Sequence, residues 1–337
     1  MEDKQKIDSI ASDVEFALSK QQDVSSLKNM SAEINTLLSF YDDCQSSAYS
    51  DCHLLLHTDT YMGWKAAVLV EKFLRTQGFE QVNLYLCEKL TTRSTAEFRF
   101  ACTTIAEHFS KILPGWKEQH YNIIFQLSGG FKSFQGFMQV VGMFFADEVI
   151  YKFEGADELI RIPRIPIKLD DTAIGIVKNN LAACRNLVRK EILTPSEAEG
   201  LLSLELFVEQ ENDMVAITPW GTLCWELAKK ELYNKELLDP HHEKIRYGQD
   251  FMKSAKNECT SAKRWEMLNE RIDDLASFIN SNQKVNLRRL DVKKLQGNPM
   301  PPSTHECDAW AESPAHRIFL HREGEVWILD KLAPGLH

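Results

Sequence analysis

The chain has 337 residues, 44% hydrophobic and 26% charged, with a formal net charge of −10. This length predicts two or three domains, and the acidic balance argues against indiscriminate binding of nucleic acid. No apolar run approaches the roughly 20 residues that span a bilayer, and the first 20 residues lack the apolar stretch of a secretory signal. We therefore expect a cytoplasmic protein without a membrane segment.

The eight cysteines include no Cys-x-x-Cys pair, and most of them have apolar neighbours. This setting favours reduced, buried thiols over disulfides or a zinc site. We expect no metal and no cofactor.

In the first half of the chain, predicted strands alternate with predicted helices. The helices are expected at 3–20, 26–41, 63–77, 96–112 (stopped by Pro114-Gly115) and 131–145, and the strands at 51–57, 82–87, 121–127 and 148–153. This alternation predicts an α/β sandwich with a parallel sheet, whose ligand site lies beyond the carboxyl ends of its strands. Two prolines within residues 162–167 predict an extended exit, so the first domain is placed at 1–168, with a helical segment over 1–45.

A second pattern follows over residues 169–240. Helices are expected at 172–191, at 195–204 (with Thr194 as N-cap and Pro195 as first helical residue) and from 218 to about 238, with a small hairpin at 206–208 and 214–217. Two helices, a hairpin and a further helix resemble a winged-helix module.

Residues 241–337 predict a small α+β domain. A short strand at 244–247 precedes a long helix or helix pair ending near residue 280, and strands are expected near 287–295, 315–321 and 325–332. Residues 243–337 hold 15 Lys and Arg against 14 Asp and Glu, whereas the preceding part has a net charge of −11. Six of the ten histidines lie after residue 240. Since basic groups and imidazoles gather here, we expect chemistry on RNA in this segment.

A glycine loop follows the strand predicted at 121–127 and opens the next helix. It comprises Ser128, Gly129, Gly130, Phe131 and Lys132. Glycines let the backbone approach a phosphate, the helix N-terminus offers free N–H groups, and Lys132 adds a charge. The alternative is a tight strand-to-helix turn in which the glycines only relieve steric clashes.

This loop resembles the signature of CARF domains, the sensors of cyclic oligoadenylate in type III CRISPR systems. The similar letters are Ser-Gly-Gly-Phe-Lys at 128–132, preceded by Ile-Ile-Phe-Gln-Leu, and a second loop, His-Thr-Asp-Thr at 57–60 before Gly63. The resemblance covers about residues 30–168 and implies a Rossmann-like fold. It also implies ligand contacts at Thr58, Asp59, Thr60, Gly63, Ser128, Gly129, Gly130, Phe131 and Lys132.

The resemblance further implies a homodimer that binds one cyclic ligand on its two-fold axis, as an allosteric activator. A two-fold site suits a four-membered ring, so cyclic tetra-adenylate is favoured. The chain departs from the family at its beginning, because the family's first ligand-contacting strand has no counterpart in the helical residues 1–45. Some CARF domains also cleave their ligand, and the sequence leaves this ring-nuclease activity open.

Residues 243–337 resemble the RelE superfamily of ribosome-dependent messenger-RNA interferases. The similarity lies in the order of elements and in two segments, 290–297 (Leu-Asp-Val-Lys-Lys-Leu-Gln-Gly) and 315–321 (Ala-His-Arg-Ile-Phe-Leu-His). It implies metal-independent cleavage of messenger RNA at the ribosome by the neighbouring 2′-hydroxyl, which needs cations, a base and an acid. The candidate cations are Lys293, Lys294 and Arg317, and the candidate acid and base are His305 and His337. Glu306 is a further candidate base, and Asp308 stands where several relatives have an arginine.

The chain is therefore identified as resembling a CARF sensor fused through a winged-helix-like linker to a RelE-like ribonuclease. The alternative is a ligand-controlled transcription regulator whose winged helix reads DNA and whose last domain is degenerate. A DNA-reading module carries a basic recognition face, but residues 195–217 contain no Lys or Arg. The first hypothesis is favoured for this reason.

Overall fold

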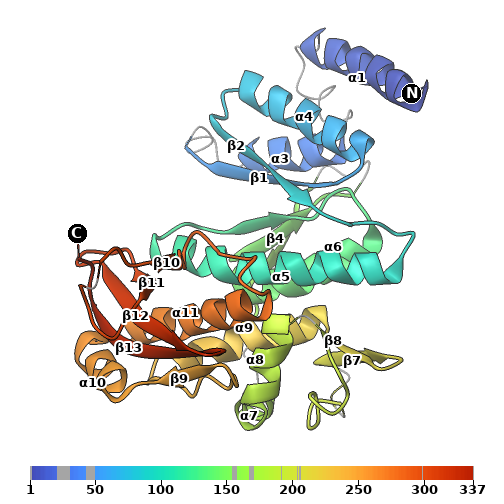
Figure 1. Cartoon of the computed structure of the whole chain (residues 1–337). Helices are drawn as coiled ribbons and strands as arrows, with labels where there is room; N and C mark the ends of the chain where they lie inside the picture. The colour runs from blue at the N-terminus through green and yellow to red at the C-terminus, as the bar shows by residue number, and fades with distance from the viewer. Residues whose placement is uncertain are drawn as a thin grey trace. The chain divides into compact units, whose positions relative to one another are not determined.

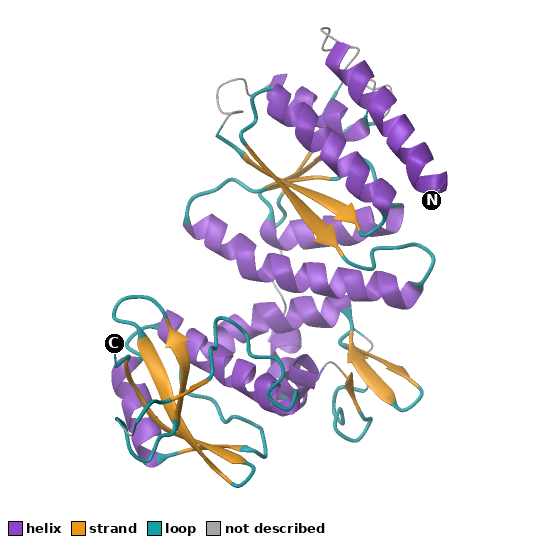
Figure 2. Ribbon diagram, turned by 45° about the horizontal axis from the view of Figure 1, so that its top comes forward, coloured by secondary structure: helices purple, strands orange, loops and turns teal. Residues whose placement is uncertain are grey.

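The structure is a computed structural model that describes residues 2–20, 31–42, 50–153, 158–166, 171–190, 192–202, 204, 206–297 and 299–336. The chain divides into two compact units, Met1–Lys168 and Leu169–His337. Each unit mixes helices with small sheets (Figures 1 and 2). Within the described ranges, no helix is long and apolar enough to cross a membrane.

The first unit follows the predicted alternation closely. Its elements are α1 (Glu2–Lys20), α3 (Ala32–Asp42), β1 (Cys52–Thr58), α4 (Tyr61–Thr76), β2 (Gln81–Cys87), α5 (Thr95–Glu118), β3 (Ile124–Gln126), α6 (Lys132–Phe145), β4 (Glu148–Tyr151) and β5 (Ile160–Pro163). The predicted helix at 26–41 is confirmed as α3 from Ala32 onward, and residues 26–30 lie outside the described residues.

The sheet of the first unit is in two pieces. Strands β1 and β2 pair in parallel, as do β3 and β4, while β5 pairs antiparallel with β4 over the residues predicted as an exit. Parallel pairing is thus confirmed within each piece, but the prediction of one parallel sheet was wrong, because none of the described strands joins β1 to β3.

Helix α3 packs against both pieces of the sheet. Thr36 forms a hydroxyl–hydroxyl hydrogen bond of 2.5 Å with Ser128, just after β3. At the other end of the helix, Tyr41 donates to Asp51 at 2.8 Å, and its ring contacts His53 of β1. Ile34 and Tyr41 also share one buried core with side chains of β2 and β4. The apolar face of α3 therefore supplies the packing that links the two pieces.

Helix α5 continues through Pro114 to Glu118, so the prediction that it stops before Pro114 was wrong. A proline inside a helix removes one backbone hydrogen bond and strains the preceding turn. Contacts around the last turn offset this cost: Leu113 is buried, Trp116 faces the ring of Tyr121, and Lys117 pairs with Asp147.

The second unit begins with the segment predicted to be winged-helix-like. Its elements are α7 (Asp171–Asn179), α8 (Leu181–Lys190), β6 (Ile192–Leu193), β7 (Val208–Glu211), β8 (Met214–Ile217) and α9 (Pro219–Tyr233). The three strands form an antiparallel sheet in the order β6-β8-β7. The predicted hairpin is confirmed as β7–β8, and Asn212 in its turn has φ = 55°.

The helix predicted at 195–204 is absent from the described residues of that segment, which form turns. Gly200 has φ = 89°, a conformation that a continuing helix does not allow, and a Cβ there would lie 2.3 Å from Asn180 Oδ1. Thr194 does bond to Glu197 as a capping pair, because its N–H donates to the Glu197 carboxylate at 2.9 Å. The predicted N-cap at Thr194 therefore forms its capping hydrogen bond, but no helix follows it in the described residues. The left-handed backbone at Gly200, packed against Asn180, is incompatible with a helix through this position.

The rest of the second unit is a five-stranded sheet packed on two helices. Its elements are β9 (Ile245–Tyr247), α10 (Gln249–Glu258), α11 (Ala262–Asn280), β10 (Lys293–Lys294), β11 (His305–Trp310), β12 (His316–Glu323) and β13 (Val326–Pro334), with strand order β10-β11-β12-β13-β9. The neighbours are antiparallel except β13 and β9. Strand β11 was missed in the sequence, and the strand predicted near 287–295 is confined to two residues.

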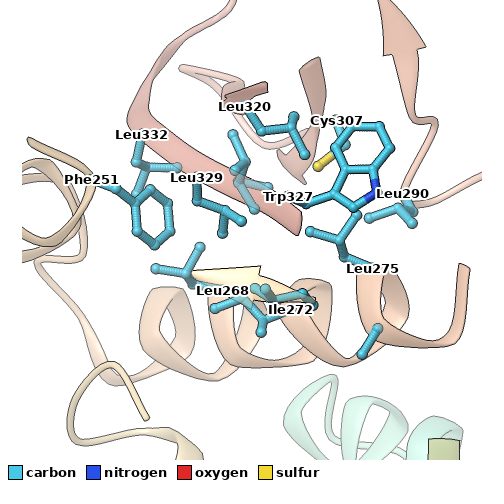
Figure 3. Close-up of a cluster of buried hydrophobic side chains, with 14 of the residues drawn as sticks. Phe251, Leu268, Ile272, Leu275, Leu290, Cys307, Leu320, Trp327, Leu329 and Leu332 are labelled. Atoms are coloured by element: carbon cyan, nitrogen blue, oxygen red, sulfur yellow. The ribbon is translucent and has the colours of Figure 1, made fainter. Parts of the chain in front are cut away.

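One face of this sheet rests on α11. Cys307 of β11, Leu320 of β12 and Leu329 of β13 point toward Ile272 and Leu275 of the helix (Figure 3). All five side chains are fully buried. We call this side the helix-covered face and the opposite side the helix-free face. Because side chains alternate along a strand, each position on β11 and β12 belongs to one face only.

A buried ionic cluster ties α8 and α9 to α11 within the second unit. Asp273 accepts hydrogen bonds at 2.9 Å from Nε of both Arg185 and Arg189, and it also accepts one from the Tyr233 hydroxyl. The two guanidinium groups additionally donate to backbone carbonyls in the segment 239–241. We call these four side chains the Asp273 cluster. Asp273 thus forms ion pairs with both buried guanidinium groups, which leaves the cluster with one positive charge in excess.

The described cysteines are free thiols, and all but Cys52 are buried. Burial raises the pKa of the thiols of Cys87, Cys102, Cys184 and Cys259 to about 12. These thiols stay protonated near neutral pH and fill the cores as small apolar groups. The predicted buried, reduced thiols are confirmed at these positions.

Candidate functional site

The glycine loop of the first unit connects β3 to α6 in a left-handed backbone conformation. Gly129 and Gly130 both have φ = 83°, which disfavours any side chain at these positions. A Cβ on Gly129 would lie 2.0 Å from Glu33 Oε1, whereas a Cβ on Gly130 would meet no atom within 4 Å. The carboxylate beside Gly129 repels an anion, so the open side of the loop is at Gly130.

The N-terminus of α6 follows this open side. Phe131 occupies the N-cap position and provides no side-chain hydrogen bond to the first turn, so the N–H groups there have no side-chain cap. Lys132 is exposed and makes no hydrogen bond or ion pair with any described residue. Ser128 points its hydroxyl back to Thr36 of α3. The backbone of Gly130 and the side chain of Lys132 are therefore the groups free to meet an anionic ligand.

The second candidate loop follows β1, and its hydroxyls are engaged within the loop. Thr58 and Thr60 form a hydrogen bond of 2.8 Å with each other, and Thr60 caps α4 by accepting from Gly63 N at 3.0 Å. Asp59 accepts from Lys89 N at 2.9 Å. A Cβ on Gly63 would lie 2.1 Å from Thr58 Oγ1, so a glycine is needed for this close approach. These contacts give the loop a defined shape at the carboxyl end of a strand.

In the second unit, the predicted catalytic residues are distributed over both faces of the C-terminal sheet. His305 pairs with Lys294 and with Leu320, whose side chain is in the helix-covered core. Lys293 pairs with Glu306, and Arg317 pairs with Asp308, both on the helix-free face. His305 and Arg317 therefore lie on opposite faces, and the structure does not bring them together. Residue type alone predicts both as catalytic, because it carries no information about the face of the sheet on which a side chain lies.

His305 lies at the rim of the helix-covered face. Its ring packs edge-on against Trp327 with 5.0 Å between ring centroids, and its Nδ1 is 2.8 Å from Thr304 Oγ1. Burial lowers the pKa of His305, and the positive charges of Lys294 and Arg322 lower it further. The imidazole is thus mainly neutral near pH 7, which suits a base better than an acid.

On the helix-free face, two of the predicted cations are paired with carboxylates. Arg317 forms an ion pair with Asp308 directly across β11 and β12. Lys293 lies 3.2 Å from Asp291 and 3.7 Å from the buried carboxylate of Glu306. Asp308 therefore serves as the partner of Arg317.

The other histidines of the unit differ in their surroundings. His316 is buried, stacks on Trp310, and holds Glu258 at 2.7 Å through Nε2, which fits a structural role. His321 is on the helix-free face with Arg317, four residues away on β12, and was not singled out in the sequence. Its even spacing from Arg317 in a predicted strand was the available signal. His337 lies outside the described residues.

No group of three or more His, Cys, Asp or Glu side chains within the described ranges is arranged to hold a metal ion. The two candidate places carry backbone N–H groups, imidazoles, carboxylates and cations. The first suits the binding of an anion, and the second suits acid–base chemistry near phosphate.

Comparison with known proteins gives one family. Residues 28–165 match the family model described as CRISPR-associated protein (Cas_APE2256). The match contains both candidate loops of the first unit and none of the second unit. No curated protein matches the chain. The first unit is therefore similar, over residues 28–165, to a family of CRISPR-associated proteins.

Proposed function

We propose that the chain is an effector of a type III CRISPR system, in which the first unit binds cyclic oligoadenylate and the second cleaves messenger RNA at the ribosome. The observation that carries this proposal is the CRISPR-associated family match, because it spans both loops that the CARF resemblance selects. Activation of the second unit by ligand on the first would make cleavage conditional on infection.

The geometry of the glycine loop supports binding of a phosphate-containing ligand. Gly130 faces open space, and the N-terminus of α6 has no side-chain cap. A phosphate at this place gains from the helix dipole and from Lys132. A cyclic tetra-adenylate on a two-fold axis would present one pair of phosphates to each protomer of a homodimer.

The C-terminal sheet supports a metal-independent ribonuclease. A short strand, two helices and then antiparallel strands follow one another as expected from the RelE resemblance, with β11 as a further strand. The helix-free face carries Lys293 and Arg317 from the predicted set, and charges of this kind stabilise the phosphorane formed when a 2′-hydroxyl attacks phosphorus. A ribosome that holds the messenger would supply affinity that a segment with a net charge of +1 lacks.

The β7–β8 hairpin fits the winged helix of the transcription-regulator alternative, but the described residues before it do not supply the other part of such a module. The described residues between β6 and β7 form turns, so a recognition helix for the major groove is lacking in them. Arg185 and Arg189 of α8 are buried against Asp273 and are not available to phosphate.

A translation reaction with and without cyclic tetra-adenylate tests the proposal. We expect messenger cleavage on ribosomes only when the ligand is present, with 5′-hydroxyl and 2′,3′-cyclic phosphate ends mapped at the cut sites. On free RNA, any cleavage should persist in excess EDTA. An intact messenger at saturating ligand, or cleavage of free RNA that stops with EDTA, contradicts the proposed activity.

A further inference from the structure

His321 is held on the helix-free face by a carboxylate that is itself held in place. Its Nδ1 lies 2.9 and 3.0 Å from the two carboxylate oxygens of Asp330. Ser303 donates its hydroxyl hydrogen to Asp330 Oδ2 at 2.6 Å. A carboxylate facing Nδ1 fixes the proton on that nitrogen and sets the orientation of the ring. The second ring nitrogen, Nε2, is then the one that can exchange a proton with another molecule.

The side chain of His321 is 16% exposed, and the ring nitrogen that does not face Asp330 is Nε2. Its described neighbour is Glu323 Oε1 at 3.3 Å, and the Glu323 side chain is 69% exposed. An exposed glutamate on the last residue of a strand is displaced at little cost, since exposed ion pairs contribute less than about 1 kcal/mol. A substrate oxygen can therefore take the place of the Glu323 carboxylate.

A cation lies beside this imidazole on the same face. Lys331 of β13 pairs with Phe319 of β12, two residues before His321, and the β-bulge at Asp330 lies between the two positions. In a regular ladder, residues offset by two positions on neighbouring strands have Cβ atoms about 7–8 Å apart, and here the bulge adds one residue of β13 between Lys331 and the position opposite His321. Lys331 is exposed and, in the described part of the chain, forms no hydrogen bond or ion pair. It differs in this from Lys293 and Arg317, which have carboxylate partners.

We propose that His321 is the general acid of RNA cleavage, that Lys331 binds the scissile phosphate, and that Asp330 is a positioning residue for His321. This inference rests on the proposed function of the second unit. The 2′-oxygen of the substrate forms a bond to phosphorus as the bond from phosphorus to the 5′-oxygen breaks. The proton on His321 Nε2 passes to the 5′-oxygen, the 2′-hydroxyl proton leaves to water, and water reprotonates the imidazole. The products are a 2′,3′-cyclic phosphate and a 5′-hydroxyl.

The charges that face His321 suit an acid. Burial alone lowers its pKa, but hydrogen bonds to Asp330 and Glu323 outweigh burial and raise the pKa above the ordinary value. Further charged groups on this face are Glu306 of β11 with its neighbour Lys293, Lys331 of β13, and Arg246 of β9, which is in register with Ile328 and His321. An imidazole with a raised pKa carries its proton near neutral pH, whereas His305, with a lowered pKa, does not.

Substitutions in the full chain test this assignment, with cyclic tetra-adenylate, ribosomes and messenger present. His321→Gln should lower the cleavage rate by about 100- to 10,000-fold, the usual contribution of a positioned acid. Lys331→Met should reduce the rate without changing its pH dependence. The wild-type rate should fall as pH rises through the pKa of His321, and Asp330→Asn should move this fall to lower pH. The control His242→Gln, before β9, should leave the rate unchanged.

Folding is checked by circular dichroism and by ligand affinity, which these substitutions in the second unit should not change. A folded His321→Gln protein with the wild-type rate and pH profile overturns the inference and leaves the proposed function standing. So does a loss of cleavage in His305→Gln that His321→Gln does not share. A wild-type protein that cuts no RNA under these conditions overturns the proposed function and the role of His321 together.

Discussion

Lys132 is the first residue of α6, directly after the glycine loop, and its side chain forms no ion pair or hydrogen bond with any described residue. The proposed function makes it a contact of the ligand phosphate. Replacing it by alanine should weaken binding of cyclic tetra-adenylate about 10- to 100-fold, in line with the loss of one charge-assisted hydrogen bond of about 1.5–3 kcal/mol. Calorimetry on the full chain measures this change. Lys111→Ala, which removes only an exposed pair with Glu107 on α5, is the matched control. Equal affinity of Lys132→Ala and wild type would remove Lys132 from the site.

The glycines of the first unit should respond to alanine with opposite signs. Gly129 and Gly130 have φ = 83°, so alanine at either position should lower the free energy of unfolding by about 1–2 kcal/mol. Gly136 lies in α6, and a Cβ there meets no atom within 4 Å. Gly136→Ala should therefore raise the free energy of unfolding by up to about 1 kcal/mol. Urea unfolding compares the three variants, and a stabilised Gly130→Ala protein would show that the loop does not need its left-handed backbone.

Arg317 and Asp308 allow a catalytic cation to be distinguished from a structural ion pair. If Arg317 stabilises the phosphorane, Arg317→Ala abolishes messenger cleavage, whereas Asp308→Ala leaves the guanidinium in place and retains activity. If the pair is only structural, both substitutions reduce stability alike and neither acts on the rate of the folded protein. Cleavage rates and melting temperatures of the two variants, measured in parallel, separate these outcomes.

Individual residues show which parts of the site could be predicted from sequence. The run 128–132 is contiguous, so its strand–glycine–helix geometry could be predicted from the letters. A site on a sheet face depends on alternation and register, which residue type alone does not reveal. His305 and Arg317 looked equally suitable in the sequence, yet β11 and β12 place them on opposite faces. His321 shares the face of Arg317, and its even spacing was readable once β12 was predicted.

At the scale of elements, the Asp273 cluster is the contact on which the second unit depends most. Asp273→Asn leaves Arg185 and Arg189 buried with no carboxylate, so we expect it to lower the free energy of unfolding by about 3–5 kcal/mol. Asp250→Asn, at an exposed side chain on α10, is the control and should change stability by less than about 0.5 kcal/mol. Guanidinium unfolding of the full chain gives both values. Equal stability of the two variants would mean that the cluster contributes nothing net.

The same cluster predicts a sensitivity to acid. Burial alone raises the pKa of Asp273, but Arg185 and Arg189 outweigh burial and hold the pKa below its ordinary value. A carboxyl with a depressed folded pKa stabilises the protein above its unfolded pKa of about 4, and this contribution is lost as pH falls through the folded value. The second unit should therefore lose stability below about pH 4, and Asp273→Asn should flatten this part of the pH profile.

Helices and strands could be predicted where their apolar residues repeat with a clear helical or strand period. They were missed where contacts with distant residues decide the local structure. The strands and helices of the first unit follow their apolar patterns closely. Strand β11 was missed because its sequence, His-Glu-Cys-Asp-Ala-Trp, contains two carboxylates and none of the β-branched residues that are typical of strands. The turns after Thr194 and the passage of α5 through Pro114 depend on contacts with Asn180 and Asp147, which are distant in sequence.

For the whole molecule, the two-fold hypothesis makes a stoichiometric prediction. One symmetric cyclic ligand shared by two first units requires one ligand for every two chains. Light scattering should give a dimer mass near twice 38.7 kDa, and calorimetry should give half a ligand per chain. A monomer that binds one ligand per chain contradicts the shared site.

The packing of α3 also has a consequence for solubility. The described strands of the first unit form two sheets, so β1 and β2 are the edges of one and β3 and β5 are the edges of the other. Unpaired edges are templates for pairing with another chain. Because α3 packs on both sheets, its partial detachment would loosen both of them at once. A substitution that loosens α3, such as Ile34→Ala, should therefore promote aggregation during heating before it abolishes folding, with the aggregates rich in intermolecular sheet.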